Sequence, residues 1–192
     1  GFGSLYPEIV RKLVLEQNLD IGISLDGDGD RVILVDEKGS VIDGDMILAI
    51  CAIDLKTRDL LRGRHVVATV MSNLGLDKLL ESHGITVVRS GVGDRYVLEE
   101  MAKLNASIGG EQSGHTIFAD YATTGDGTLT ALQVLSVMCR TGKSLSELTS
   151  QFIRFPQKLI NINVANKPPF DSIEPLKKII AAKEKELKNN GR

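Results

Sequence analysis

Three aspartates separated by single glycines form the segment with the clearest chemical potential. Asp26, Asp28 and Asp30 alternate with Gly27 and Gly29. Alternate side chains of an extended segment point the same way and lie roughly 6.5–7 Å apart, and the glycines let the backbone curl so that the carboxylates converge. Three like charges this close repel one another unless a cation lies among them. The segment therefore predicts a site for Mg²⁺, Ca²⁺ or Mn²⁺ that also faces a substrate phosphate.

Two other interpretations of this segment stay open, a structural calcium loop of the EF-hand type and a solvated acidic turn. The three acids and Glu37 fall where an EF-hand loop carries ligands. Arg31 occupies the position at which that loop needs glycine, and the flanking residues look like strands rather than helices. The planar guanidinium of Arg31 suits a phosphate oxygen; the alternative is that Arg31 only offsets the acidic charge.

A second candidate site lies at Gly110–His115. Glu111, Ser113 and His115 occupy alternate positions, so that one face carries an acceptor, a hydroxyl and an imidazole, the set that a polyol substrate needs. A nucleophilic Ser113–His115 pair is disfavoured, because residues two apart rarely reach attack geometry. His115 as an ordinary strand residue remains the alternative.

Two further glycine-rich loops precede predicted helices. The loop at Gly91–Arg95 ends at a helix start, where free N–H groups favour anions, and Arg95 adds a positive charge. Asp94 is also a good candidate for a simple helix cap. The loop at Thr123–Gly127 is interpreted in large part as a helix cap as well.

Strands and helices alternate along most of the chain, which predicts an α/β fold with a mixed, largely parallel sheet layered with helices. In such sheets the loops beyond the carboxyl ends of the strands bind ligands, so the glycine-rich loops are expected to face one cleft. We expect caps at residues 43–45 and 72–73. We expect strands at residues 21–25, 32–35, 41–42, 65–71, 85–89, 106–108, 116–119 and 158–164, and helices that end near residues 17, 61, 83, 104, 140, 152 and 188.

Composition narrows the class of protein. The 192 residues carry a net charge of −2, which gives no footprint for nucleic acid. The longest apolar run, 46–53, is too short for a membrane span. Cys51 and Cys139 both lie in apolar helical patterns and are expected to be buried free thiols. With no signal peptide in view, we expect a cytoplasmic protein.

Taken together, the motifs resemble the α-D-phosphohexomutase family. The family's magnesium loop D-G-D-G-D-R stands at Asp26–Arg31, and its sugar loop G-E-x-S-G-H stands at Gly110–His115. The segments Met71–Leu76, Val92–Val97 and Thr123–Gly127 are similar to the bacterial branch that acts on glucosamine phosphates.

The resemblance implies a reaction and its participants. Enzymes of this family move a phosphate between O6 and O1 of a sugar through a phosphoserine and a bisphosphorylated intermediate, here glucosamine 1,6-bisphosphate. Carried over, Asp26, Asp28 and Asp30 bind one Mg²⁺ per active site. Glu111, Ser113, His115 and Arg95 bind the substrate, and Arg31 and His115 assist near the reacting phosphate. The substrate is a small phosphosugar, and no nucleic acid or membrane takes part.

The resemblance also implies a domain order. Residues 1–43 would be the end of the family's second domain, with the metal loop, 44–153 a complete third domain, and 154–192 the start of the fourth. The family's T-A-S-H-N-P and R-x-S-G-T-E-P motifs do not occur in the chain, so we expect it to lack activity without the other domains of the same polypeptide. A homodimer, a phosphomannomutase or phosphoglucomutase specificity, and a non-catalytic module that binds a divalent metal or a sugar phosphate stay open.

Overall fold

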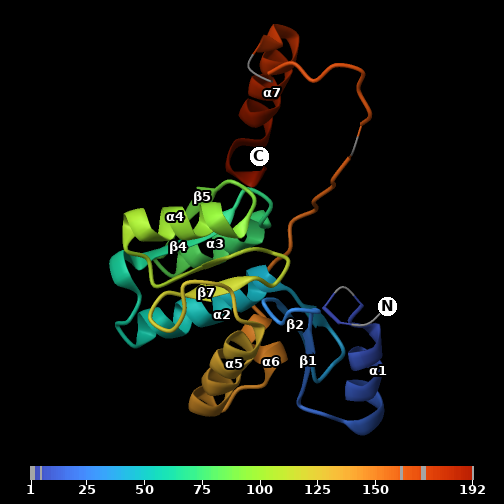
Figure 1. Ribbon diagram of the computed structural model, residues 1–192, viewed down its shortest axis with the longest axis vertical. Coiled ribbons are helices and arrows are strands. Elements are labelled where there is room, and N and C mark those ends of the chain that lie inside the picture. The colour runs from blue at the N-terminus through green and yellow to red at the C-terminus, as the bar shows by residue number, and fades with distance from the viewer. Residues whose placement is uncertain (1–2, 5, 161, 170–171, 192) are drawn as a thin grey trace. The chain divides into compact units, whose positions relative to one another are not determined.

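The structure is a computed structural model, which describes residues 3–4, 6–160, 162–169 and 172–191 (Figure 1). The chain divides into two compact units, Gly1–Arg154 and Phe155–Arg192. Both candidate sites lie in the first unit. No helix within the described residues is long and apolar enough to cross a membrane.

The first sheet is small and antiparallel. Its strands β1 (Ile21–Leu25), β2 (Val32–Asp36) and β3 (Val41–Ile42) lie in the order β1-β2-β3. Helix α1 (Glu8–Gln17) packs against β1 and β2. Gly22 permits this close packing, because a Cβ there would collide with the side chains of α1.

The second sheet is mixed and has the strand order β5-β4-β6-β7. Its strands are β4 (His65–Thr69), β5 (Thr86–Ser90), β6 (Ile108–Gly110) and β7 (Thr116–Phe118). Strand β4 pairs in parallel with β5 and β6, and β7 closes the sheet as an antiparallel edge. The prediction of a mixed, largely parallel sheet is confirmed for these strands.

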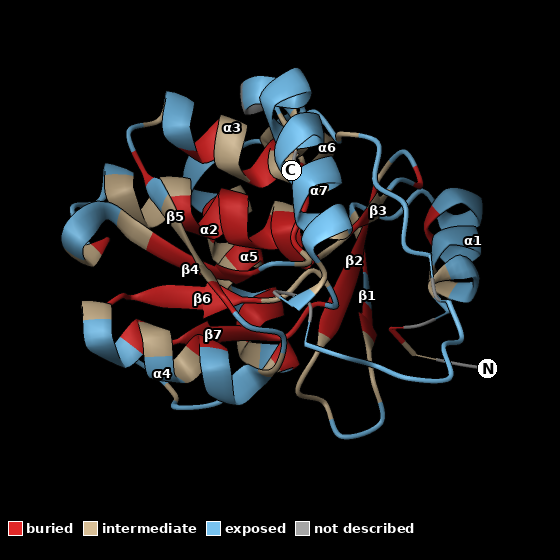
Figure 2. Ribbon diagram, turned by 90° about the horizontal axis from the view of Figure 1, so that it is seen from above, coloured by how far each residue is buried: buried red, intermediate tan, exposed pale blue. Residues whose placement is uncertain are grey.

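Helices cover both faces of the second sheet, as Figure 2 shows. They are α2 (Gly44–Thr57), α3 (Leu74–Ser82), α4 (Asp94–Leu104) and α5 (Gly127–Thr141), and the short helix α6 (Leu145–Thr149) packs against α2. Successive side chains of β4 point to opposite faces, as the strand period requires. Val66 and Ala68 join the core formed with α2, α3 and α5, whereas Val67 packs with Val97 and Met101 of α4.

Helix α5 links the two sheets. It contacts β1 and β2 of the first sheet, β7 of the second, and α2 (Figure 1). The first residue of α5, Gly127, is buried. The side chain of Asp126 caps the helix by accepting the N–H of Leu129 at 2.8 Å. The start of α5 therefore lies where the loop between β1 and β2 meets the second sheet.

The second unit is described by itself. It contains α7 (Glu174–Leu187) and a short 3₁₀ turn at Lys188–Asn190. The strand expected at 158–164 is wrong for the described residues of that segment, which have no regular structure. Its apolar side chains at Leu159, Ile160, Ile162 and Val164 are exposed. An alternating pattern gives a strand only where a neighbouring strand supplies hydrogen bonds.

Other expectations also need correction. Cys139 is exposed rather than buried, although Cys51 is buried as expected, and both thiols are free. Helix α2 ends at Thr57 rather than near residue 61, because a short 3₁₀ turn at Arg62–Arg64 leads into β4. Helix α4 is capped by Gly93, so Asp94 is its first residue and not its cap.

Candidate functional site

The acidic segment forms the loop between β1 and β2. The pairing of Leu25 with Val32 closes the loop at its base, and Gly29 takes the left-handed φ of +75° that a non-glycine residue rarely adopts. One carboxylate oxygen from each of Asp26, Asp28 and Asp30 lies within 4.8 Å of the others. The loop thus brings together the three carboxylates expected from their spacing.

Charge repulsion shapes the ionisation of this loop. Partial burial raises the pKa of Asp30, and its contact with Asp26 and the charges of Asp26 and Asp28 raise it further. Burial acts in the same sense on Asp26, but the backbone N–H of Arg31, the Asp30 side chain and the Arg31 charge outweigh it and lower the pKa of Asp26. The buried Oδ1 of Asp30 has no hydrogen-bond partner among the described residues. A divalent cation fits this donor set, because it would relieve the repulsion and satisfy the open oxygen.

The EF-hand interpretation is wrong, because strands and not helices flank the loop. Glu37, which that interpretation made a metal ligand, lies on the far side of β2. Its Oε1 accepts a hydrogen bond from Oγ of Ser146 at 2.5 Å. Burial tends to raise the pKa of Glu37, but the hydrogen bonds from Ser146 and its neighbours at the start of α6 lower it overall.

Arg31 lies beside two of the carboxylates. Its Nε is 3.9 Å from Oδ2 of Asp26 and 3.9 Å from Oδ1 of Asp30, and its side chain is 42% exposed. Its Nε makes no hydrogen bond among the described residues. The guanidinium therefore balances part of the acidic charge and retains donors for an anion.

The second candidate site is the turn between β6 and β7, and it meets the metal loop through His115. The backbone of His115 forms an isolated antiparallel bridge with Arg31. The side chain of His115 is buried and only 2% exposed. Nε2 lies 3.8 Å from Oδ2 of Asp30. The two loops, which are more than 80 residues apart in the sequence, thus form one site.

Glu111 connects the sugar-loop motif to a third loop. Its Oε1 accepts the backbone N–H of Gly93 at 3.0 Å, and its Oε2 accepts the hydroxyl of Ser113 at 3.4 Å. The backbone of the turn is fixed by the N–H of Gly44, at the start of α2, which donates to the carbonyl of Gln112 at 3.0 Å. The acceptor of Glu111 and the exposed hydroxyl of Ser113 therefore lie side by side.

Arg95 lies at the surface, one residue into α4. Its side chain is 82% exposed, and its Nε is 2.7 Å from Oε1 of Glu99 on the same helix. This contact raises the pKa of Arg95. The loop that precedes Arg95 is joined to the other site residues by the hydrogen bond from the N–H of Gly93 to Glu111. The guanidinium of Arg95 pairs with Glu99 instead.

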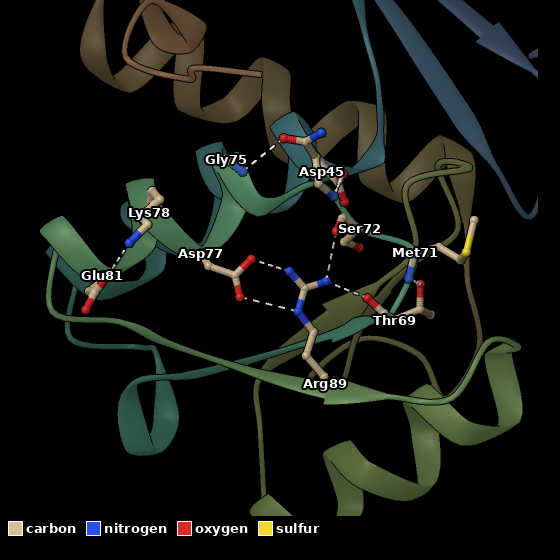
Figure 3. Close-up of polar contacts among 10 residues, drawn as sticks. Asp45, Thr69, Met71, Ser72, Gly75, Asp77, Lys78, Glu81 and Arg89 are labelled. Carbon is tan, nitrogen blue, oxygen red and sulfur yellow. Dashed lines mark hydrogen bonds and ion pairs between the residues drawn. The ribbon is translucent and has the colours of Figure 1, made fainter. Parts of the chain in front are cut away.

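Another polar cluster holds the loop that follows β4 (Figure 3). Arg89 of β5 pairs with Asp77 of α3 and donates to the carbonyls of Thr69 and Ser72, the former at 2.5 Å. The guanidinium therefore ties the ends of β4 and β5 to the first turn of α3.

Asp45 anchors the same loop from α2. It is completely buried, and its Oδ2 accepts the N–H of Asn73 at 2.7 Å. The side chain of Asn73 caps α3 by accepting the N–H of Gly75 at 2.9 Å, as its position before the helix predicts. Burial raises the pKa of Asp45 to about 6, aided by the charge of Asp43.

Sequence reasoning did not identify two glycine contacts in the site. The N–H of Gly125 donates to Nε2 of His115 at 3.2 Å, and the N–H of Gly127 donates to the carbonyl of Gly29 at 2.8 Å. Helix capping, which the sequence predicts for a large part of the loop at Thr123–Gly127, explains Asp126 alone. A cap needs only one side chain, so capping leaves the glycines on both sides of Asp126 unexplained. These two glycines are the signal in the sequence that could have indicated the contacts.

The sequence of the chain is similar to those of known phosphosugar mutases. Residues 43–155 match the family model described as phosphoglucomutase/phosphomannomutase, alpha/beta/alpha domain III. The phosphoglucosamine mutase of Chlamydia abortus is 53% identical over 190 residues, which are 99% of this chain and 42% of that protein. The phosphoglucosamine mutase of Caldanaerobacter subterraneus is 53% identical over 194 residues, with 100% and 43% covered. The chain thus spans about two-fifths of the length of these curated relatives.

Solved structures share the fold. A phosphoglucomutase/phosphomannomutase family protein from Burkholderia thailandensis superposes with a TM-score of 0.71 at 24% identity, over 80% of this chain and 33% of that chain. The Aspergillus fumigatus N-acetylphosphoglucosamine mutase, solved with GlcNAc-6P and magnesium, gives a TM-score of 0.66 at 20% identity, over 88% and 43%.

Proposed function

Because the chain belongs to the phosphoglucomutase/phosphomannomutase family, we propose that it supplies the metal loop and the sugar loop of a phosphoglucosamine mutase active site. The reaction is the transfer of a phosphate between O6 and O1 of glucosamine. The observation that carries the proposal is the meeting of the two loops, with Nε2 of His115 3.8 Å from Oδ2 of Asp30. The identity of about 53% to phosphoglucosamine mutases supports the amino sugar as substrate.

The aspartates and Arg31 neutralise charge in this proposal. Asp26, Asp28 and Asp30 hold Mg²⁺, which when bound offsets the negative charge on a transferring phosphoryl group. Arg31 directs its guanidinium toward an oxygen of the same phosphate and reduces the repulsion among the aspartates when the cation is absent. Phosphoryl transfer depends mainly on such positioning and charge neutralisation.

The sugar-binding residues orient the substrate. Glu111 accepts hydrogen bonds from sugar hydroxyls, and the hydroxyl of Ser113, beside it, both donates and accepts. The buried His115 lies at the junction of the sugar and the phosphate. Arg95 contributes a positive charge at the surface end of the 91–95 loop.

We assign the rest of the active site to other domains of the same polypeptide. Residues 1–43 form the end of the family's second domain, 44–153 the third domain and 154–192 the start of the fourth. The phosphoserine that exchanges phosphate with glucosamine 1,6-bisphosphate belongs to the first domain. This chain alone is therefore expected to bind ligands without turnover.

Backbone NMR of the 192-residue chain tests this assignment. Addition of Mg²⁺ should shift the amide signals of residues 26–31, and glucosamine 6-phosphate should shift those of 91–95 and 110–115. Glucose 6-phosphate and mannose 6-phosphate should bind more weakly. Asp28→Asn should remove the Mg²⁺ response, whereas Asp20→Asn, at an exposed acid just before β1, should leave it unchanged.

Each other outcome argues against the proposal in a defined way. Tighter binding of mannose or glucose 6-phosphate would change the substrate to that of a phosphomannomutase or phosphoglucomutase. Tight Ca²⁺ binding with no response to Mg²⁺ or to any phosphosugar would indicate a non-catalytic metal-binding module.

A further inference from the structure

The start of α5 contacts both halves of the candidate site. The short segment Gly125–Gly127 contributes two backbone N–H groups, one directed to His115 and the other to the metal loop. Asp126, between the two glycines, caps α5 through its side chain and so fixes the segment to the helix. Because α5 packs against both sheets, the segment has a rigid support.

The contact with His115 determines where the imidazole proton lies. The N–H of Gly125 donates to Nε2 at 3.2 Å. A ring nitrogen that accepts a hydrogen bond carries no proton, so the proton of the neutral ring lies on Nδ1. Nδ1 is buried and makes no hydrogen bond among the described residues, so the N–H of Gly125 is the group that fixes the ring. A Cβ on Gly125 would collide with the ring atoms Cδ2 and Nε2 of His115, so only glycine permits this approach.

The contact with the metal loop fixes the backbone between two carboxylates. The N–H of Gly127 donates at 2.8 Å to the carbonyl of Gly29, the residue that separates Asp28 from Asp30. A Cβ on Gly127 would lie 2.5 Å from the carbonyl oxygen of Arg31 and 2.7 Å from Cδ2 of Leu25. Any larger residue at 127 must therefore push the metal loop away from α5.

We propose that Gly125 and Gly127 are positioning residues. Gly125 holds the imidazole of His115 in its Nδ1–H form, and Gly127 fixes the position of the metal loop relative to that imidazole. The proposal rests on the function proposed above for its catalytic meaning, but its structural content does not depend on turnover. Capping of α5 does not require these contacts, because Asp126 already supplies the cap.

The wild-type chain provides the first test. Long-range ¹H–¹⁵N NMR distinguishes the two imidazole tautomers, and the chain has three histidines to assign. At one pH near neutrality, His115 should show a protonated Nδ1 and an unprotonated Nε2. A protonated Nε2 would overturn the proposal without any variant.

Two alanine variants separate the two contacts. Gly127→Ala should weaken Mn²⁺ binding, followed by electron paramagnetic resonance, by ~10–100-fold, the usual effect of losing a group that orients metal ligands. Gly125→Ala should alter the imidazole signals of His115 while it changes Mn²⁺ affinity less. Unchanged His115 signals in Gly125→Ala, or unchanged Mn²⁺ affinity in Gly127→Ala, would contradict the proposal.

Gly142→Ala is the matched control. Gly142 ends the same helix with a φ of +66°, so alanine there is strained, but a Cβ would meet no atom within 4 Å. This variant should melt at a lower temperature with the same Mn²⁺ affinity and the same His115 signals. If it reproduced the effects of the other two variants, those effects would reflect lost stability and the proposal would fail. If the tautomer and metal results hold but no phosphosugar binds, the proposed function fails while the positioning role stands.

Discussion

Oε1 of Glu111 accepts the backbone N–H of Gly93 at 3.0 Å, although Gly93 follows β5 and Glu111 lies in the turn between β6 and β7. Gly93 precedes α4 with a φ of +122°, a conformation that residues other than glycine rarely adopt. The carboxylate that we propose binds the sugar therefore also fixes the position of the loop that carries Arg95.

Replacement of Glu111 tests this double role. Glu111→Ala should accelerate hydrogen exchange at the Gly93 amide and weaken glucosamine 6-phosphate binding by at least about 10-fold, because hydrogen bonds to charged groups contribute about 1.5–3 kcal/mol. Glu111→Gln, which retains an acceptor, should keep the Gly93 amide protected and lose only part of the affinity. Equal exchange rates in the alanine variant and the wild type would refute the anchoring role.

Buried Asp45 should make the stability of the chain depend on pH. Its folded pKa of about 6 exceeds the ordinary value of 3.8, so the folded state retains a proton that the unfolded state has released. Its contribution to stability is therefore greatest below about pH 4, falls as the pH rises to about 6, and is constant above. The difference between the ordinary pKa of 3.8 and the folded pKa of about 6 corresponds to about 3 kcal/mol of stability.

Asp45→Asn measures that contribution, since the amide oxygen can still accept the N–H of Asn73. The stability of the variant relative to the wild type, from urea unfolding, should increase by about 3 kcal/mol between pH 3.5 and pH 7.5. Parallel pH profiles for the two proteins would show that Asp45 ionises as freely in the folded chain as in the unfolded one.

Close packing of α2 against the sugar loop predicts a sharp difference between two glycines. A Cβ on Gly44 would collide with the carbonyl oxygen of Glu111 and would lie 2.8 Å from the nitrogen of Gly114, whereas a Cβ on Gly27 would meet no atom within 4 Å. Gly44→Ala should therefore cost about 1–3 kcal/mol of stability, and Gly27→Ala should change it by less than about 0.5 kcal/mol. Thermal melts check this, and equal losses in the two variants would show that the loop tolerates displacement.

Local signals in the sequence predicted much of the fold. The apolar run 21–25 ends at the acidic segment and forms β1 with the expected bounds. Asp43, Asn73 and Asp126 each cap a helix, because short polar side chains before an apolar pattern satisfy the free N–H groups of the first turn.

Other features depend on partners distant in the sequence. Strand β6 was expected at 106–108 but lies at Ile108–Gly110, since glycine is unfavourable in a strand unless a neighbour needs the space. Here Met101 of α4 packs so closely that a Cβ on Gly109 would lie 2.6 Å from its sulfur. The contacts of Gly93 with Glu111 and of Gly125 with His115 are likewise tertiary, so no local pattern reveals them.

Turnover in a grafted enzyme tests the central claim most directly. The 192 residues would replace the matching 190 residues of the Chlamydia abortus phosphoglucosamine mutase, and ³¹P NMR would follow glucosamine 6-phosphate with Mg²⁺ and glucosamine 1,6-bisphosphate. We predict formation of glucosamine 1-phosphate, a rate at least ~100-fold lower with Asp28→Asn, and an unchanged rate with Asp20→Asn. A folded graft that forms no glucosamine 1-phosphate, or an Asp28→Asn graft with the full rate, would contradict the account.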